Sequence, residues 1–294
     1  MIRTDPLPGA GRLDVVATPI GNLSDLSPRA RDALAQANLI AAEDTRRTAQ
    51  LLHAIGVSSK LISLHDYNEL GRIEGLVQQL RAGQIIALVS DAGTPLLSDP
   101  GFALVRAVSA AGILVRAIPG PSALTAALSI AGLATDRFAF EGFLPARAAE
   151  RRASIERLAH EVRTLVFFEA PHRIAAALTD MAAELGAERA AVVARELTKV
   201  HETIYRGTLS QLAARAQTEE NFARGELTLV VHGAAPAARP VDEQLLRRIV
   251  ELLSGELPPG RVAAIAAQLT GATRAAAYAL ATRGGAVEEG GGSP

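Results

Sequence analysis

The sequence predicts an α/β protein with two α/β domains and a small helical extension, and three observations support this fold class. Short apolar segments alternate with helical segments from Leu13 onward, which is typical of a parallel sheet covered on both faces. Later apolar segments lie close together in the chain, which favours a mixed and partly antiparallel second sheet. The 294 residues are 49% hydrophobic, enough for two domains with substantial cores.

The N-terminal α/β domain is predicted over residues 12–120. Its five strands are expected in the segments LDVVATP, LIAAEDT, KLISLHD, QIIALVSD and ILVRAIPG. The helix after the first strand is expected to start at Pro28 with Ser27 as its N-cap, because a serine oxygen can accept from free amides and proline suits the first turn. The next helix, RRTAQLLHAIG, is expected to end at Gly56.

The C-terminal mixed α/β domain is predicted over residues 121–233. It should contain a helix in SALTAALSIAGL, a helix from Glu150 to about His160 and a helix in RIAAALTDMAAELG. Its strands are expected in RFAFEGF, TLVFFEA, RAAVVAREL, ETIYRGTL and GELTLVVHG.

A Pro/Ala-rich linker follows Gly233, and a helical extension is predicted over 241–284. Its last two helices flank a short turn at Thr270–Gly271, a spacing that resembles a helix-turn-helix. The glycine-rich segment 285–294 is expected to be disordered.

Composition excludes several classes of function. The formal net charge of −1 does not by itself indicate a nucleic-acid-binding protein. The absence of cysteine excludes disulfides, thiolate chemistry and cysteine metal sites. No apolar run approaches ~18 residues and the N-terminal segment lacks an apolar signal core, so we expect no membrane span and a cytoplasmic location.

Polar, glycine and proline residues follow all five predicted strands of the first domain. Ligands of an open parallel sheet bind beyond the carboxyl ends of its strands, so five such loops on one edge predict a binding site, whereas ordinary turn chemistry would explain one. The loop at Asp91–Pro95 has one glycine, an acid and no lysine, unlike a pyrophosphate loop. It suits a zwitterionic ligand such as S-adenosylmethionine. Glu43 and Asp44 lack a third ligand at a convincing spacing, so we predict no metal.

The motifs VATPIGNLSD, AAEDTRRT, LVSDAGTPLLSDPG, IPGPSA, EGFLP, FFEAPHR and ARELTKVHE resemble the tetrapyrrole methylase superfamily. Within it they are similar to the branch that methylates a cytidine ribose 2′-oxygen in small-subunit (16S) ribosomal RNA. The resemblance covers about Leu13 to Gly233, and the helical extension also matches. It implies S-adenosylmethionine in a cleft between two α/β domains, and a homodimer that acts on the small ribosomal subunit.

The resemblance also implies a set of cofactor contacts. They fall on Pro19, Ala92, Gly93, Thr94, Leu97, Ser122, Ala123, Phe168, Glu169 and Leu197. One departure concerns Phe168, where the ribosomal RNA branch often has tyrosine, so no catalytic hydroxyl is assigned there.

A ribose 2′-hydroxyl is a weak nucleophile and gains from a positioned base. The candidate catalytic residues are Lys199, Glu196 and His172. Lys199 could accept the proton as a neutral amine or act as a cation on the hydroxyl or a phosphate, and it could equally be a surface cation. Glu196 could instead hold its loop by pairing with Arg195, and His172 could be a helix cap.

RNA affinity comes mainly from phosphate contacts. Local arginine clusters could supply them or could be solvated helix faces: Arg46–Arg47, Arg147, Arg151–Arg152, Arg157 and, in the extension, Arg247–Arg248, Arg261 and Arg274. Tyr67 and Phe143 could stack on a flipped base, although core burial is the more common fate of such a phenylalanine. The alternatives are a methyltransferase of a corrin or porphyrin precursor, and a cofactor-sensing RNA-binding module without activity.

Overall fold

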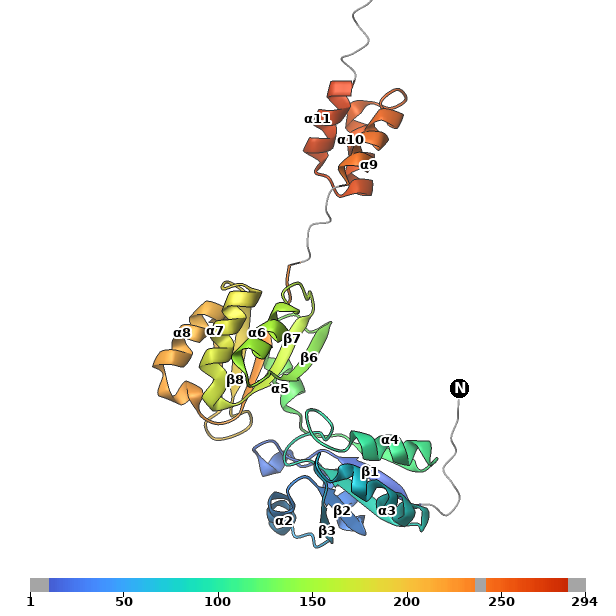
Figure 1. Ribbon diagram of the computed structural model, residues 1–294, viewed down its shortest axis with the longest axis vertical. Helices are drawn as coiled ribbons and strands as arrows, with labels where there is room; N and C mark the ends of the chain where they lie inside the picture. Colours follow the sequence, from blue (N-terminus) through green and yellow to red (C-terminus); the bar gives the residue numbers. More distant parts are fainter. Residues whose placement is uncertain (1–10, 236–241, 285–294) are drawn as a thin grey trace, which may run out of the picture. The chain divides into compact units, whose positions relative to one another are not determined.

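The computed structural model describes residues 11–235 and 242–284, which belong to two compact units (Figure 1). The first unit ends at Ala234 and contains two β-sheets, and the second contains three helices. Because both sheets lie in one unit, the domain boundary at residue 120 stays a prediction. The segment 285–294, predicted to be disordered, and most of the predicted linker lie outside the described residues.

The first sheet has five parallel strands, as predicted, and their order is β3-β2-β4-β1-β5. These strands are β1 (Arg12–Val16), β2 (Leu39–Ala42), β3 (Leu61–Ser63), β4 (Ile85–Val89) and β5 (Leu114–Ile118). One face packs on α1 (Pro28–Gln36) and α2 (Thr45–Ala54), and the other on α3 (Glu69–Arg81) and α4 (Phe102–Ala110). In β4, Ala87 and Val89 point to the first face, and Ile86 and Leu88 to the second, so the apolar run is buried on both sides.

Local capping chemistry sets where the first helices begin. Ser27 accepts a hydrogen bond from the Ala30 amide and Pro28 opens α1, so the predicted start is confirmed. Helix α2 begins one residue earlier than predicted, at Thr45, because the Asp44 carboxylate accepts from the Arg46 amide.

The second sheet is mixed, as predicted, with the order β6-β7-β10-β8-β9. Its strands are β6 (Phe138–Phe143), β7 (Thr164–Glu169), β8 (Ala190–Arg195), β9 (Thr203–Thr208) and β10 (Leu227–Val231). Strands β6 and β7 are parallel and the other neighbours are antiparallel. Helices α6 (Ala148–Glu156), α7 (Ile174–Leu185) and α8 (Leu209–Thr218) cover one face, and α5 (Ala123–Ala131) covers the other.

Two helices of this sheet differ from the expectation. Helix α6 runs from Ala148 to Glu156, two residues earlier at its start and about four at its end than predicted. Helix α8 was missed altogether, although Thr208 and Gln211 form a reciprocal capping box at its N-terminus.

The second unit contains three helices, where two or three were expected: α9 (Glu243–Leu253), α10 (Pro259–Thr270) and α11 (Arg274–Gly284). Gly271, with a φ of +77°, ends α10 and gives the short turn into α11. The three helices share their own apolar core, which includes Leu246, Val250, Val262 and Ala277. Among the described residues, no helix is long and apolar enough to cross a membrane.

Candidate functional site

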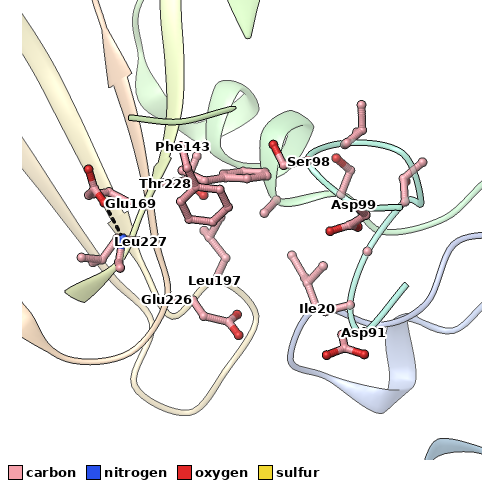
Figure 2. Close-up of a pocket in the computed structure, with 18 of the residues that line it drawn as sticks. Ile20, Asp91, Ser98, Asp99, Phe143, Glu169, Leu197, Glu226, Leu227 and Thr228 are labelled. Atoms are coloured by element: carbon pink, nitrogen blue, oxygen red, sulfur yellow. Dashed lines mark hydrogen bonds between the residues drawn. The ribbon is translucent and has the colours of Figure 1, made fainter. Parts of the chain in front are cut away.

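A cavity of about 400 Å³ lies between the two sheets of the first unit, at the carboxyl ends of the β1, β2 and β4 strands (Figure 2). This volume is within the range of about 300–1,000 Å³ that is usual for small-molecule sites. The loops after these strands form one wall. The start of α5 and the ends of β6, β7, β8 and β10 contribute the rest of the lining.

Backbone pairing holds the loops after β1 and β4 side by side. Thr18 and Gly93 exchange two backbone hydrogen bonds of 2.9 and 3.0 Å. Gly93 has a φ of +84°, and a Cβ there would lie 3.2 Å from the Ile20 side chain, which also lines the cavity. A glycine is therefore required by conformation and favoured by space.

The segment after Gly93 is strained. Leu96 and Ser98 have φ angles of +74° and +69°, which are uncommon for residues with side chains, and they bring Ser98 and Asp99 into the cavity lining. Gly142, at a register shift in β6, makes room for Ser98 by having no side chain, since a Cβ there would lie 2.9 Å from the Ser98 hydroxyl. The second sheet is thus fitted to this loop.

Three carboxylates, Glu43, Asp91 and Asp99, form what we call the acidic wall. The Asp91 carboxylate accepts from the Asp44 amide at 2.9 Å and lies 3.3 Å from the guanidinium of Arg47. Burial raises the pKa of Glu43 and raises that of Asp99 to about 6. The negative charges of Asp91 and Asp66 add to both shifts, and that of Glu43 adds to the shift of Asp99. A wall of this kind favours a cationic ligand.

The opposite wall carries aromatic rings. Phe168 lines the cavity and holds the rings of Phe140 and Phe143 edge-on, at centroid distances of 4.9 and 5.7 Å. Phe143 remains 55% exposed, so the burial considered from the sequence is wrong and its ring is available at the cavity. Figure 2 shows this ring on the side of the gap that faces Ser98.

Glu169 borders the cavity, but its carboxylate is bonded to groups of the protein. It accepts from the Ala170 amide at 2.8 Å and lies 3.2 Å from the Arg173 guanidinium, which donates to the Leu144 and Pro145 carbonyls. Burial raises its pKa. Figure 2 shows the carboxyl group well away from Asp99. The side chain therefore positions the segment after β6.

The three predicted catalytic residues lie next to the cavity without lining it. Lys199 and Glu196 belong to the loop 196–202 between β8 and β9, and the Lys199 Nζ lies 2.8 Å from Glu196 Oε1 and 3.1 Å from Glu226 Oε2. Burial favours the neutral amine, but the bonds to both carboxylates outweigh it and raise the pKa of Lys199. His172 is exposed beside Pro171, which does line the cavity.

The sequence-predicted cofactor residues are brought together. Nine of the ten residues line this cavity. The exception is Pro19, whose neighbour Ile20 lines the cavity instead. Sequence reasoning missed the lining side chains of Ser98, Asp99 and Glu226. It also counted Arg151 in a basic cluster, whereas this side chain is buried against Asp180 at 2.7 Å.

Comparisons with known proteins agree with this geometry. The family model of Tetrapyrrole (Corrin/Porphyrin) Methylases matches residues 12–213, and the model of the RsmI C-terminal HTH domain matches residues 240–283. Ribosomal RNA small subunit methyltransferase I of Xylella fastidiosa is 54% identical, over 91% of this chain and 98% of the relative. The protein of that name from Escherichia coli O157:H7 is 46% identical, over 92% and 94%. Uroporphyrin-III-C-methyltransferase from Thermus thermophilus shares the fold, with a TM-score of 0.52 and 19% identity over 76% of this chain and 94% of that chain.

Proposed function

Because this chain belongs to the family of ribosomal RNA small subunit methyltransferase I, we propose that it methylates a cytidine ribose 2′-oxygen in 16S ribosomal RNA. The methyl donor is S-adenosylmethionine. The observation that carries the proposal is the cavity at the strand ends, where an acidic wall faces an exposed aromatic ring. The first suits a cationic cofactor and the second suits a nucleobase.

The residues present fit this cofactor. Ala92 and Gly93 expose backbone rather than long side chains, and Ser122 and Ala123 open α5 on the same cavity. The acidic wall offers negative charge to the ammonium and sulfonium groups, and Leu97 and Phe168 offer apolar surface. When bound, the cofactor supplies a methyl group activated by a positive sulfur.

Cofactor affinity should depend on the ionisation of Asp99. Above pH 6 this carboxylate is charged and attracts the cation, and below pH 6 it is protonated and the attraction is lost, because burial and its acidic neighbours raise its pKa to about 6. We expect the dissociation constant of S-adenosylmethionine, measured by calorimetry, to rise as the pH falls from 8 to 5. The Asp99→Asn variant should bind S-adenosylmethionine weakly at pH 8 and should lose this part of the pH dependence. If the variant had the same pH profile as the parent protein, Asp99 would be excluded from the site.

Phe143 should contribute to substrate binding by stacking on a base, an interaction that is worth about 1–3 kcal/mol. Phe143→Ala is expected to raise KM for small ribosomal subunits by about tenfold while cofactor affinity stays the same. Phe138→Ala is the matched control, since Phe138 lies on the same strand and is 41% exposed but does not line the cavity. Equal effects of the two substitutions would argue against stacking at Phe143.

The runner-up substrate, a corrin or porphyrin precursor, fits the cavity less well. A macrocycle with many carboxylates requires cationic partners, whereas the described lining contains four carboxylates besides Glu169 and a single arginine, Arg47. The test is transfer of labelled methyl from S-adenosylmethionine to small subunits that lack 2′-O-methylation, with a tetrapyrrole precursor in parallel. Label in an alkali-resistant dinucleotide supports the proposal, and label in the macrocycle alone overturns it.

The chemistry proposed for the Lys199 loop follows from its charges. Two carboxylates raise the pKa of Lys199, so it serves as an ammonium ion. Of its two possible roles, proton acceptor and cation, this leaves the role of a cation. Glu196 fixes that ammonium ion. His172 is exposed and follows Pro171, which lines the cavity, so of the three candidate catalytic residues it has the least support.

The partners follow from surfaces outside the cavity. Leu70 at the start of α3 and Phe102 at the start of α4 are 77% and 66% exposed, and the two helices pack together. We propose that these apolar side chains take part in the contact between the two subunits of a homodimer. The three C-terminal helices are proposed to bind RNA on the small subunit. We propose that this activity is cytoplasmic, where a chain of this family would meet its ribosomal substrate.

A further inference from the structure

Glu226, the residue before β10, is a carboxylate of the cavity that no cofactor role accounts for. Its side chain is 67% exposed and lines the cavity on the wall opposite the acidic wall. Figure 2 shows its carboxylate pointing into the gap toward Ile20 and Asp91. It therefore faces the space where a second molecule would meet the cofactor.

A closed network holds Glu226 in place. Lys199 Nζ lies 3.1 Å from its Oε2, and Glu196 Oε1 accepts both from Lys199 Nζ at 2.8 Å and from the Glu226 amide at 2.8 Å. The Glu196 amide in turn donates to the Glu226 carbonyl at 2.9 Å. Side chain and backbone of Glu226 are thus fixed by the same two residues.

The loop that builds this network is strained and closely packed. Glu196 and Thr198 have φ angles of +53° and +65°. Gly225 lies so close under Glu196 that a Cβ there would be 2.4 Å from the Glu196 carboxyl group. On the other side, a Cβ on Gly21 would be 2.3 Å from the Lys199 stem, so the loop after β1 supports it. Strain of this kind persists where the surroundings impose it, and it clusters at functional sites.

The other carboxylates are less suited to the hydroxyl of the substrate. The Asp91 carboxylate pairs with Arg47 and accepts a hydrogen bond from the Asp44 amide. Glu43 Oε2 accepts a hydrogen bond from the Asp91 amide at 3.3 Å. Asp99 belongs to the acidic wall, whose combined charge matches the cofactor. Among these four lining carboxylates, Glu226 is the one that pairs with a fixed lysine and still points into the gap.

Resting on the proposed function, we propose that Glu226 is the catalytic residue that accepts the 2′-hydroxyl proton, and that Lys199 and Glu196 are its positioning residues. The hydroxyl proton passes to a carboxylate oxygen of Glu226 as the bond from ribose oxygen to methyl carbon forms. The bond from methyl carbon to sulfur breaks and its electron pair stays on sulfur, which becomes a neutral thioether. Glu226 then releases the proton to water at the exposed rim.

Glu226→Gln tests this assignment, because the amide keeps the shape and can still accept from Lys199 but cannot take a proton. We expect kcat for methylation of small ribosomal subunits to fall by at least about 100-fold, with an unchanged melting temperature. The dissociation constant of S-adenosylmethionine, measured by calorimetry, should stay within about twofold of the parent. Glu220→Gln is the matched control: Glu220 is an exposed glutamate that pairs with Arg224 and does not line the cavity, and its variant should keep parental kcat.

The positioning role has its own readout. Lys199→Met keeps the aliphatic stem against Gly21 and removes the charge, and it should lower kcat at least about tenfold with little change in KM. Lys199→Arg restores a cation and should recover most of that loss. A purely structural lysine would instead change the melting temperature, and arginine would not restore kcat.

Each outcome of these experiments either supports or overturns the role of Glu226. Turnover of Glu226→Gln within about threefold of the parent would overturn the proposal, and so would a loss of activity explained by weaker cofactor binding. If the parent itself labels no RNA while it binds the cofactor, the proposed function fails, and the role of Glu226 in that reaction fails with it. An active parent with an inactive Glu226→Gln that binds the cofactor normally supports both.

Discussion

Gly93→Val is expected to weaken S-adenosylmethionine binding by at least about 100-fold, the largest single effect on the cofactor. The backbone at Gly93 has a φ of +84°, which a β-branched residue adopts only at a cost of about 1–3 kcal/mol. The new side chain would also contact Ile20 at the cavity and would disturb the backbone pairing between Thr18 and Gly93. Calorimetry with S-adenosylmethionine measures the effect directly.

Gly56→Val separates backbone strain from loss of the site. Gly56 also has a positive φ, +66°, but a Cβ there meets no atom within 4 Å and the residue lies at the far end of α2. This control should lower the melting temperature and leave cofactor binding intact. Normal binding by Gly93→Val would remove the loop after β4 from the cofactor site.

Removal of the C-terminal helices is expected to reduce kcat/KM for small ribosomal subunits by at least about tenfold, while cofactor affinity stays the same. The reason is that α9–α11 form a separate unit with its own core, so the cavity does not depend on them. They carry the exposed Arg247, Arg248, Arg261 and Arg274, and phosphate contacts of such residues supply much of RNA affinity.

The cut should follow Ala235. Gly233 packs against the Val162 carbonyl, and the Ala234 amide donates to the Glu161 carbonyl at 2.6 Å, so an earlier cut would disturb the second sheet. Cofactor titration and a melting curve show whether the shortened chain is folded. Full activity of this chain on subunits would mean that the helices are an appendage without a role in RNA binding.

The fold was predictable from the sequence where apolar periodicity determines the strands and capping residues determine the helix ends. The strands of the first sheet are apolar runs with small polar loops behind them, and Ser27–Pro28 marks the start of α1 unambiguously. Helix α8 shows the limit of such reading. Its capping residues Thr208 and Gln211 are visible in the sequence, but the preceding strand β9 runs directly into the helix without a turn residue to separate them.

The site was predictable only where a motif fixes it. Gly93 and Ser122 follow strand ends and were expected to meet. Asp99 reaches the same cavity because Leu96 and Ser98 adopt left-handed conformations, and no residue type at these positions signals that turn. Glu226 depends on a loop thirty residues earlier in the chain, whose amide bonds and ion pairs become apparent only in three dimensions.

The alternation of side chains in β7 links the site to the stability of its domain. Phe167 faces the core under α6, α7 and α8, and its neighbour Phe168 faces the cavity. A one-residue slip in pairing would exchange the two rings, because strand side chains alternate with a period of two. Evolution can therefore adjust this wall by substitution but hardly by insertion or deletion, since the same register that presents Phe168 to a ligand also fills the hydrophobic core.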